Sequence, residues 1–285
     1  MTGESKKFYQ MSVEERLAWL SEQTGLSAEV LAPLAEGGGL HTEQADHMIE
    51  NVVGLHSLPL GIAQNFIVNG REVLVPMTLE EPSVVAGASF MAKLARSSGG
   101  FFASSSDPLM IGQMQILDLA DAPSARLRLL EAREQLLAEA AQVDPLLAQL
   151  GGGPREIEVR ILEGPGLGTF LVLHLIYDVR DAMGANAVNT AMERLSPMVE
   201  SLTGGRVLLR ILSNLADRRL ARARMTVRLE ELAFENYAAE EVRDGIIAAW
   251  AFAAADPYRA ATHNKGIMNG VDAVVIATGN DWRAV

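Results

Sequence analysis

The order of strands and helices predicted for the middle of the chain constrains its fold more than any other sequence feature. Hydrophobic periodicity predicts strands at 110–117, 156–162, 169–179 and 207–212, and helices at 122–150 and 187–202. Three glycines at 151–153 end the first helix, and residues 164–168 fit the loop of a hairpin. The resulting β-α-β-β-α-β order is that of a ferredoxin-like split unit, so we predict an inserted domain over residues 108–213.

The residues on both sides of this insert, 1–107 and 214–285, are expected to form one large, helix-rich α+β domain. Ser12 and Glu15 have the spacing of a capping box that begins a helical arm. Asn69-Gly70 is a strong hairpin signal. The expected elements are a helix at 42–51, strands at 64–68 and 72–76, a buried helix at 83–95, a loop at 97–106, mixed and helical structure at 215–254, and a strand at 273–277.

The composition excludes several classes of function. Because none of the 285 residues is cysteine, disulfides, thiolate zinc sites and cysteine nucleophiles are ruled out. A net charge of −12 opposes binding to nucleic acid or to an anionic membrane. The longest apolar run, 246–255, is too short to span a bilayer, and the first ten residues contain no apolar leader segment. We therefore expect a soluble, cytoplasmic protein.

The usual nucleotide-binding glycine motifs are missing from the chain: there is neither a G-x-G-x-x-G after a strand nor a G-x-x-x-x-G-K-[ST]. The turn from Asp178 to Asn186 does follow an apolar strand and precede a helix, whose N-terminus favours anions. Alternatively, it is an ordinary βα turn in which Gly184 supplies backbone freedom and Asn186 caps the helix. The two interpretations are compatible.

Two polar motifs could carry acid–base chemistry. Glu80 and Glu81 precede a helix expected to be internal, and a desolvated carboxyl has a raised pKa. The alternative is a pair of first-turn carboxylates that the helix dipole favours. Lys265 lies among small and polar residues at 262–270, where its ammonium could meet a ligand carbonyl oxygen. The alternative is an exposed loop lysine, which base rates favour unless the ammonium has a carboxylate partner; Asp281 is a candidate for that partner.

The histidines give no sign of a metal site. None has the spacing of a motif such as H-E-x-x-H, and one of them lies within an apolar strand. We interpret all five as structural: His41, His47, His56, His174 and His263.

Five segments, in this order, resemble the signatures of class II (bacterial-type) hydroxymethylglutaryl-CoA (HMG-CoA) reductases. They are Glu50–Gly54, Val75–Glu81, Asp181–Asn186, His263–Gly270 and Gly279–Asp281. The resemblance covers essentially the whole chain. It implies an oxidoreductase that interconverts HMG-CoA with mevalonate and CoA, by two successive hydride transfers with a nicotinamide cofactor. The reaction would pass through a hemithioacetal and an aldehyde.

The resemblance assigns catalytic roles to three residues. Lys265 would polarise the thioester and aldehyde oxygens and stabilise the developing oxyanion. Glu81 would supply or accept the proton of that oxygen. Asp281 would sit between them, keeping Lys265 charged and raising the pKa of Glu81. Members of the family are homodimers with shared active sites, so Glu81 and Lys265 are expected to come from different chains; a higher oligomer is left open.

The resemblance also assigns residues that bind the substrate. Ser83, Arg259 and Asn269 match positions that hold the HMG portion, and Arg259 would give a bidentate grip on its free carboxylate. Asn214 resembles a position that faces the nicotinamide. Coenzyme A enters as part of the substrate.

A non-Rossmann small domain would bind the dinucleotide, which agrees with the missing glycine fingerprint. The residues implied to line that site are Asp181, Met183, Gly184 and Asn186. Asp144 matches a position that faces the adenosine ribose in NAD-preferring relatives, where a carboxylate accepts from a 2′-hydroxyl and repels a 2′-phosphate. We therefore expect NAD rather than NADP.

One departure from the family pattern concerns the end of the sequence. Relatives continue into a C-terminal region with a histidine that protonates the departing CoA thiolate, and none of the histidines here matches it. We therefore expect either a fragment of a longer enzyme or a chain that lacks one catalytic residue. The alternatives are a truncated, non-catalytic CoA- or dinucleotide-binding relative, and an unrelated α+β oxidoreductase. The physiological direction, mevalonate breakdown or synthesis, is not encoded.

Overall fold

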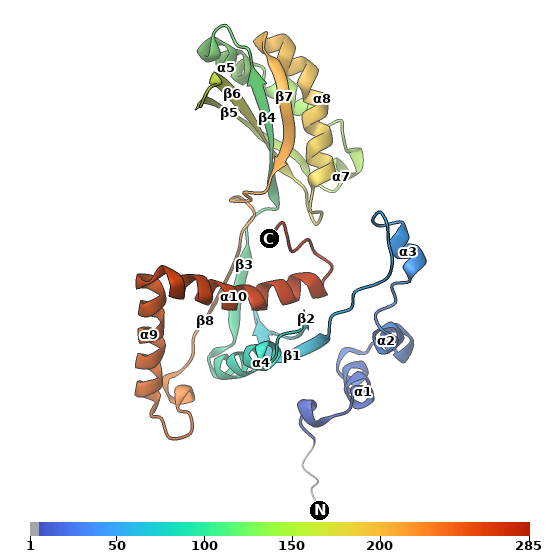
Figure 1. Cartoon of the computed structure of the whole chain (residues 1–285), viewed down its shortest axis with the longest axis vertical. Coiled ribbons are helices and arrows are strands. Elements are labelled where there is room, and N and C mark those ends of the chain that lie inside the picture. The colour runs from blue at the N-terminus through green and yellow to red at the C-terminus, as the bar shows by residue number, and fades with distance from the viewer. Residues whose placement is uncertain (1–5) are drawn as a thin grey trace, which may run out of the picture. The chain divides into compact units, whose positions relative to one another are not determined.

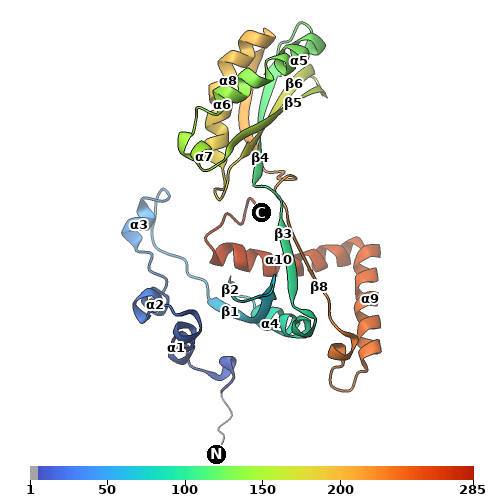
Figure 2. The same ribbon diagram turned by 180° about the vertical axis from the view of Figure 1, so that it is seen from behind.

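The structure, a computed structural model, describes residues 6–285. The chain separates into two compact units, Met1–Pro59 and Leu60–Val285. It belongs to the α+β class, and the second unit contains two separate four-stranded sheets, seen from opposite sides in Figures 1 and 2. From residue 6 onward, no helix combines the length and apolar character needed to cross a membrane.

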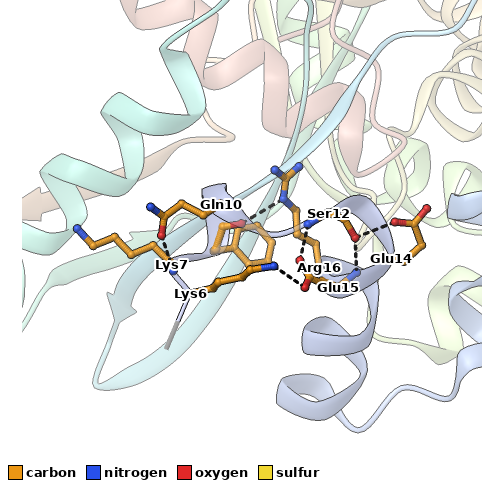
Figure 3. Close-up of polar contacts among 8 residues, drawn as sticks. Lys6, Lys7, Gln10, Ser12, Glu14, Glu15 and Arg16 are labelled. Carbon is orange, nitrogen blue, oxygen red and sulfur yellow. Dashed lines mark hydrogen bonds and ion pairs between the residues drawn. The ribbon is translucent and has the colours of Figure 1, made fainter. Parts of the chain in front are cut away.

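The first unit is built from short helices: η1 (Phe8–Gln10), α1 (Val13–Thr24), α2 (Ala28–Ala35) and α3 (Thr42–Asp46). The predicted capping box is confirmed, because the Ser12 hydroxyl accepts from the Glu15 amide (3.2 Å) and the Glu15 carboxylate accepts from the Ser12 amide (2.7 Å) (Figure 3). α3 is shorter than the helix predicted at 42–51. The amides of His47 and Met48 bond to carbonyls only three residues back, and this tighter turn ends the helix.

The first sheet of the second unit has the strand order β2-β1-β3-β8. Its strands are β1 (Leu60–Val68), β2 (Arg71–Thr78), β3 (Phe101–Ser105) and β8 (Ala221–Met225). The predicted hairpin is confirmed, since Asn69 and Gly70 both have positive φ (50° and 78°), as a tight two-residue turn requires. The loop predicted at 97–106 is wrong, because residues 101–105 pair with β8. That partner is remote in sequence, so no local pattern indicates the strand.

Three longer helices accompany this sheet: α4 (Val84–Ala95), α9 (Ala239–Ala255) and α10 (Pro257–Ala277); η2 (Arg96–Ser98) and η3 (Leu229–Leu232) are short turns. α4 packs against β1, α10 packs against β2, and α9 contacts α10. The buried core between them is small. Its buried residues are Ala63, Met77 and Ala273.

Two predictions for these helices are wrong. The helix predicted to be buried at 83–95 is largely accessible: within α4 only Ala92 and Ala95 are buried, because α4 meets β1 through one face. The strand predicted at 273–277 is the last part of α10. Its β-branched residues favour a strand locally, but helical packing against the small core overrides that propensity.

The second sheet has the order β5-β6-β4-β7 and is antiparallel throughout. Its strands are β4 (Leu109–Leu117), β5 (Gly153–Gly164), β6 (Gly168–Asp178) and β7 (Arg206–Ser213). The helices α5 (Ala122–Glu131), α6 (Arg133–Ala140) and α8 (Ala185–Thr203) pack on one face (Figures 1 and 2). The succession of strands and helices is the predicted one. The domain boundaries at 107/108 and 213/214 stay a prediction.

The single helix predicted at 122–150 is wrong, because the segment forms α5, α6 and α7 (Pro145–Gln149). The residue before a proline disfavours helical backbone, so a new helix begins at Pro145. The Asp144 carboxylate caps it by accepting from the Leu147 amide (2.8 Å). Because the segment is divided into three helices, each helix places one leucine in the core: Leu129 in α5, Leu136 in α6 and Leu147 in α7.

The second sheet and its helices enclose the larger of the two cores. Side chains with at most 1% of their surface exposed come from the two central strands, β4 and β6, and from the helices, among them Met114, Leu129, Leu171, Leu173, Leu175, Met192 and Leu195. Successive side chains of a strand point to opposite faces of the sheet. A shift of one residue in strand pairing would therefore move these side chains away from the helices, which fixes the register.

Candidate active site

An ion pair joins two of the predicted catalytic residues. The Lys265 ammonium donates to the Glu81 carboxylate, with 2.5 Å between Nζ and Oε2. Glu81 follows the end of β2 and precedes α4, whereas Lys265 lies in the middle of α10, which packs along β2. Both side chains are open to solvent, with exposed fractions of 44% and 61%. The prediction that these two residues meet in space is confirmed.

Helical spacing explains why Lys265 reaches this place. Lys265, Asn269 and Ala273 follow one another at intervals of four residues, so they lie along one face of α10. Ala273 is buried in the small core beneath β2, and this contact fixes which face of the helix turns toward the sheet. Lys265 therefore donates to the Glu81 carboxylate, and Asn269, one turn further along the same face, also lowers the pKa of Glu81. The interpretation of Lys265 as an exposed loop residue is wrong, because α10 is continuous there.

The charge state of Glu81 differs from the prediction. We expected burial to raise its pKa, but the carboxyl is exposed and the hydrogen bond from Lys265 lowers its pKa. Slight desolvation opposes this effect, while the charge of Lys265 and a hydrogen bond from Asn269 add to it. Glu81 is therefore a carboxylate at neutral pH in the structure as it stands.

Asp281 does not occupy the expected position between Glu81 and Lys265. Its carboxylate accepts hydrogen bonds from the Arg283 side chain at 3.1 and 3.0 Å and from the Arg283 amide at 3.0 Å. These bonds lower the pKa of Asp281, the side-chain bond of Arg283 being the largest cause. The physical reason is local: Gly279, in the left-handed region, turns the chain after α10, and Asp281 stabilises that turn.

The contact of Glu81 with Lys265 described above lies within one chain, and the expectation that a shared active site combines these residues from different chains stays a prediction. Both residues belong to one chain, because α10 returns to β2 within the same unit. Among the residues predicted to hold the substrate, Asn269 follows Lys265 by one turn of α10 and lowers the pKa of Glu81. Ser83 is two residues from Glu81 and begins α4 with a left-handed backbone (φ 71°). Arg259 lies in the first turn of α10, where its amide donates to Asp256 (2.7 Å).

The predicted cofactor residues form a loop at the end of β6. Asp181 and Met183 are exposed, and Gly184 begins α8 with a φ of 97°. A side chain at Gly184 would collide with Val179, so only glycine fits that close approach. Asn186 lies within the helix and does not cap it, so that part of the alternative interpretation is wrong. The first amides of α8 have no side-chain cap and remain free for an anionic group.

Two other predicted cofactor residues lie outside this loop. Asp144 is half-buried and serves as the N-cap of α7. Asn214 is exposed just after β7, and its carbonyl accepts from the Ala216 amide (3.0 Å). The structure therefore divides the predicted cofactor residues among the β6–α8 loop, the start of α7 and the segment after β7.

Three arginines that belong to none of the predicted site residues lie in or beside the β6–α8 loop. Arg155 donates to the buried carboxylate of Asp178 (2.8 Å), and the Arg180 side chain lies 3.4 Å from the same carboxylate. Arg219, on the segment after β7, donates to the carbonyls of Ala182 (2.8 Å) and Arg180 (3.4 Å). The contacts of Arg155 and Arg219 join separate segments of the chain, and no spacing in the sequence indicates them.

The comparisons with known proteins agree on one family. Residues 12–285 match hydroxymethylglutaryl-coenzyme A reductase. The 3-hydroxy-3-methylglutaryl-coenzyme A reductase of Archaeoglobus fulgidus is 50% identical over 100% of this chain, and a probable one of Borreliella burgdorferi is 32% identical over 84%. The class II 3-hydroxy-3-methylglutaryl-CoA reductase of Streptococcus pneumoniae, solved with NADPH in open conformations, has a TM-score of 0.91 at 42% identity.

These matches differ in how much of each relative they cover. The alignment covers 98% of this chain and 75% of the Streptococcus pneumoniae chain. The alignments with the Archaeoglobus fulgidus and Borreliella burgdorferi proteins cover 64% and 54% of those proteins, respectively. The matched part includes both sheets and the Glu81–Lys265 pair, which lie within residues 12–285. The chain therefore belongs to the HMG-CoA reductase family and has the fold of a class II member.

Proposed function

We propose that the protein interconverts HMG-CoA with mevalonate and CoA through two successive hydride transfers with a nicotinamide cofactor. The observation that carries this proposal is the contact of Glu81 with Lys265 on one chain. An ammonium and a carboxylate in hydrogen-bonding distance can polarise a carbonyl oxygen and exchange a proton with it. Both reductive steps need these two actions.

Lys265 is the residue we assign to the reacting oxygen. Its side chain is 61% exposed, so a substrate oxygen can approach the ammonium without unfolding α10. When the thioester or aldehyde oxygen accepts a hydrogen bond from Lys265, the negative charge that develops on it during hydride transfer is stabilised. The nicotinamide supplies the hydride, and Lys265 keeps the oxygen oriented.

Glu81 is the residue we assign to the proton. In the free site the Lys265 hydrogen bond is the largest cause of its lowered pKa. A substrate oxygen that takes over this hydrogen bond removes that cause, so the pKa of Glu81 rises as the site fills. Substrate binding would thereby allow Glu81 to take up a proton and deliver it to the oxygen.

The HMG portion would lie along α10. Arg259 and Lys265 are six residues apart on this helix, which separates them by about 9 Å along its axis. The guanidinium suits the free carboxylate of HMG, while Asn269 and Ser83 lie beside Glu81. This arrangement would place the thioester end of the substrate at Lys265.

The dinucleotide would bind along the β6–α8 loop, at Asp181, Met183, Gly184 and Asn186, with Asn214 facing the nicotinamide. The free amides at the start of α8 favour its phosphates. We propose NAD as the preferred cofactor, because the Asp144 carboxylate would repel a 2′-phosphate. NADPH in the Streptococcus pneumoniae structure supports the cofactor class, and the choice between the two is the finer part of this proposal.

We further propose that the protein works as a cytoplasmic homodimer. α9 has no buried residue in the single chain, yet it exposes Ile246, Ile247, Trp250 and Phe252, each more than half accessible. A helix of this composition gains stability only when its apolar side chains are covered. A second copy of the chain would cover α9 and could complete the open site near Glu81.

Oxidation of NADH and of NADPH in the presence of HMG-CoA tests the proposal. The 285-residue chain should be assayed beside a longer polypeptide that carries a C-terminal region of the kind expected from the family. We expect HMG-CoA-dependent oxidation that consumes two cofactors for each CoA released. If neither polypeptide turns over although both bind NADH and HMG-CoA, the protein is a non-catalytic binding relative.

A further inference from the structure

The side chain of Arg219 connects two segments that the proposed function places around one cofactor. Its guanidinium donates to the carbonyl oxygens of Ala182 (2.8 Å) and Arg180 (3.4 Å), both in the β6–α8 loop. Arg219 itself lies on the segment that leads from β7 to β8, five residues after Asn214. One side chain therefore spans the loop of Asp181 and the segment of Asn214.

The loop that Arg219 contacts has an unusual backbone path. Arg180 has a left-handed backbone (φ 52°), the Ala182 amide donates to the Val179 carbonyl (3.1 Å), and Gly184 is in the left-handed region. A backbone that leaves the common regions persists only where its surroundings hold it. Arg219 donates to two carbonyls of the loop, and the amides at the start of α8, which follows, have no side-chain cap.

The segment that carries Arg219 is itself fastened on both sides. The neighbouring Arg218 forms ion pairs with Glu156 (3.3 Å) and with Glu158 on β5. The Arg218 carbonyl accepts from the Ser106 hydroxyl (2.8 Å), and the Arg219 amide donates to the Ala216 carbonyl (3.0 Å). Because the segment is anchored, the Arg219 guanidinium acts from a fixed position.

We propose that Arg219 is a positioning residue for the nicotinamide cofactor, a role that rests on the proposed function. It holds the loop of Asp181, Met183 and Gly184 at a set distance from the segment of Asn214, so that the dinucleotide meets both at once. A guanidinium suits this task because its planar fork offers several donors to two carbonyls, whereas an ammonium is a single point of attachment. The residue touches neither the reacting oxygen nor the hydride.

Direct binding measurements on the whole chain test this role. Arg219→Lys keeps the charge but removes the fork, and Arg219→Gln removes the charge. We expect both variants to raise the Kd for NADH about tenfold, from the loss of charged hydrogen bonds, while the Kd for HMG-CoA stays unchanged. Arg206→Lys is the matched control, because Arg206 is an exposed arginine that pairs with Asp118 at the other end of β7.

Each outcome decides between the alternatives. Unchanged NADH binding in Arg219→Lys overturns the positioning role, as does an equal loss of NADH and HMG-CoA affinity, which would indicate a general loss of structure. If the unaltered chain binds neither NADH nor NADPH, the proposed function fails before the role of Arg219 is reached. A selective loss of cofactor affinity, with Arg206→Lys like the unaltered chain, supports the role.

Discussion

The two sheets of the second unit differ in how much of their structure is self-sufficient. The sheet β5-β6-β4-β7 buries many large side chains beneath its helices, whereas the sheet β2-β1-β3-β8 buries three residues, of which only Met77 is large. The Glu81–Lys265 pair lies beside the sheet β2-β1-β3-β8, and both of its side chains are open to solvent. The difference indicates that the packing of β5-β6-β4-β7 is supplied by its own helices, while much of the surface around β2-β1-β3-β8 is left uncovered within one chain.

The largest effect should come from Lys265, if the exposed pair is the catalytic centre that we propose. Lys265→Met removes the ammonium from the reacting oxygen, and we expect kcat to fall about a thousandfold. The measurement is HMG-CoA-dependent NADH oxidation under saturating substrate. Lys93→Met, at an exposed lysine on α4, is the control. If Lys265→Met kept roughly a tenth of the rate or more, the catalytic assignment would be wrong.

The unequal cores predict unequal costs of truncation. Leu173→Ala, in β6, leaves a cavity among fully buried neighbours and should lower the free energy of unfolding by about 3 kcal/mol. Leu94→Ala, at a half-buried position of α4, should cost about 1 kcal/mol, because part of that side chain is already in water. Urea unfolding at pH 7 measures both. Equal costs would remove the contrast between the two sheets.

The sequence predicted the better-packed sheet well and the other sheet poorly. The apolar patterns of β4, β5, β6 and β7 are local in the sequence, and the run in β6 is strong because eight successive residues of that strand, Leu171–Asp178, are buried. β3 and β8 are short and almost wholly exposed, and their pairing is long-range, so no periodicity marks them. Residues 273–277 show the opposite case. Their β-branched side chains favour a strand locally, but the run is helical because Ala273 packs in the small core with Ala63 and Met77.

The site could be predicted only in part for a similar reason. The motifs that contain Glu81 and Lys265 are short and local, and the resemblance to a family links them. The direction of the Glu81 pKa depends on burial and on its neighbours, which spacing does not reveal. Arg219 belongs to no motif, and its role depends on two carbonyls whose positions follow from the fold.

The exposed apolar side chains of α9 predict that two copies of the chain associate through this helix. Trp250→Asp places a charge on the apolar face, and we expect the dimer Kd to rise at least about tenfold. Analytical ultracentrifugation measures the change. Leu146→Asp, at an exposed position of α7, is the control and should leave the dimer intact. A chain that stays monomeric at high concentration without any substitution would contradict the proposed homodimer.

Asp144 tests whether the cofactor side discriminates between NAD and NADP. Asp144→Asn removes the charge but keeps a side chain that caps α7 well, so the helix should remain intact. We expect the preference for NADH over NADPH, as a ratio of kcat/KM values, to fall about tenfold once the repulsion of the 2′-phosphate is gone. Asp121→Asn, at the N-cap of α5, is the matched control. An unchanged ratio would show that Asp144 does not face the ribose.

The smallest effect concerns His174, which faces outward from β6 yet is only 7% exposed. Burial is the largest cause that lowers its pKa, and the charge of Arg160 lowers it further. Arg218 acts in the same direction, whereas Glu158 and Asp217 oppose it. The Gln113 amide nitrogen donates to Nε2 of the neutral ring (2.9 Å), and a protonated ring could not accept this hydrogen bond.

The sign of the pH dependence follows from the lowered pKa. The unfolded chain takes up the proton first, near pH 6.5, so the stability contributed by neutral His174 is complete above that pH and declines as the pH falls toward the folded-state pKa. His174→Gln should lack this decline, so its unfolding free energy should converge on that of the unaltered chain between pH 7 and pH 5. His263→Gln, at an exposed histidine of α10, should follow the unaltered chain throughout. If unfolding free energy varied with pH in the same way for the unaltered chain and for His174→Gln, burial would not lower the pKa of His174. The outward face of β6 would then be as open to water as the Glu81–Lys265 pair.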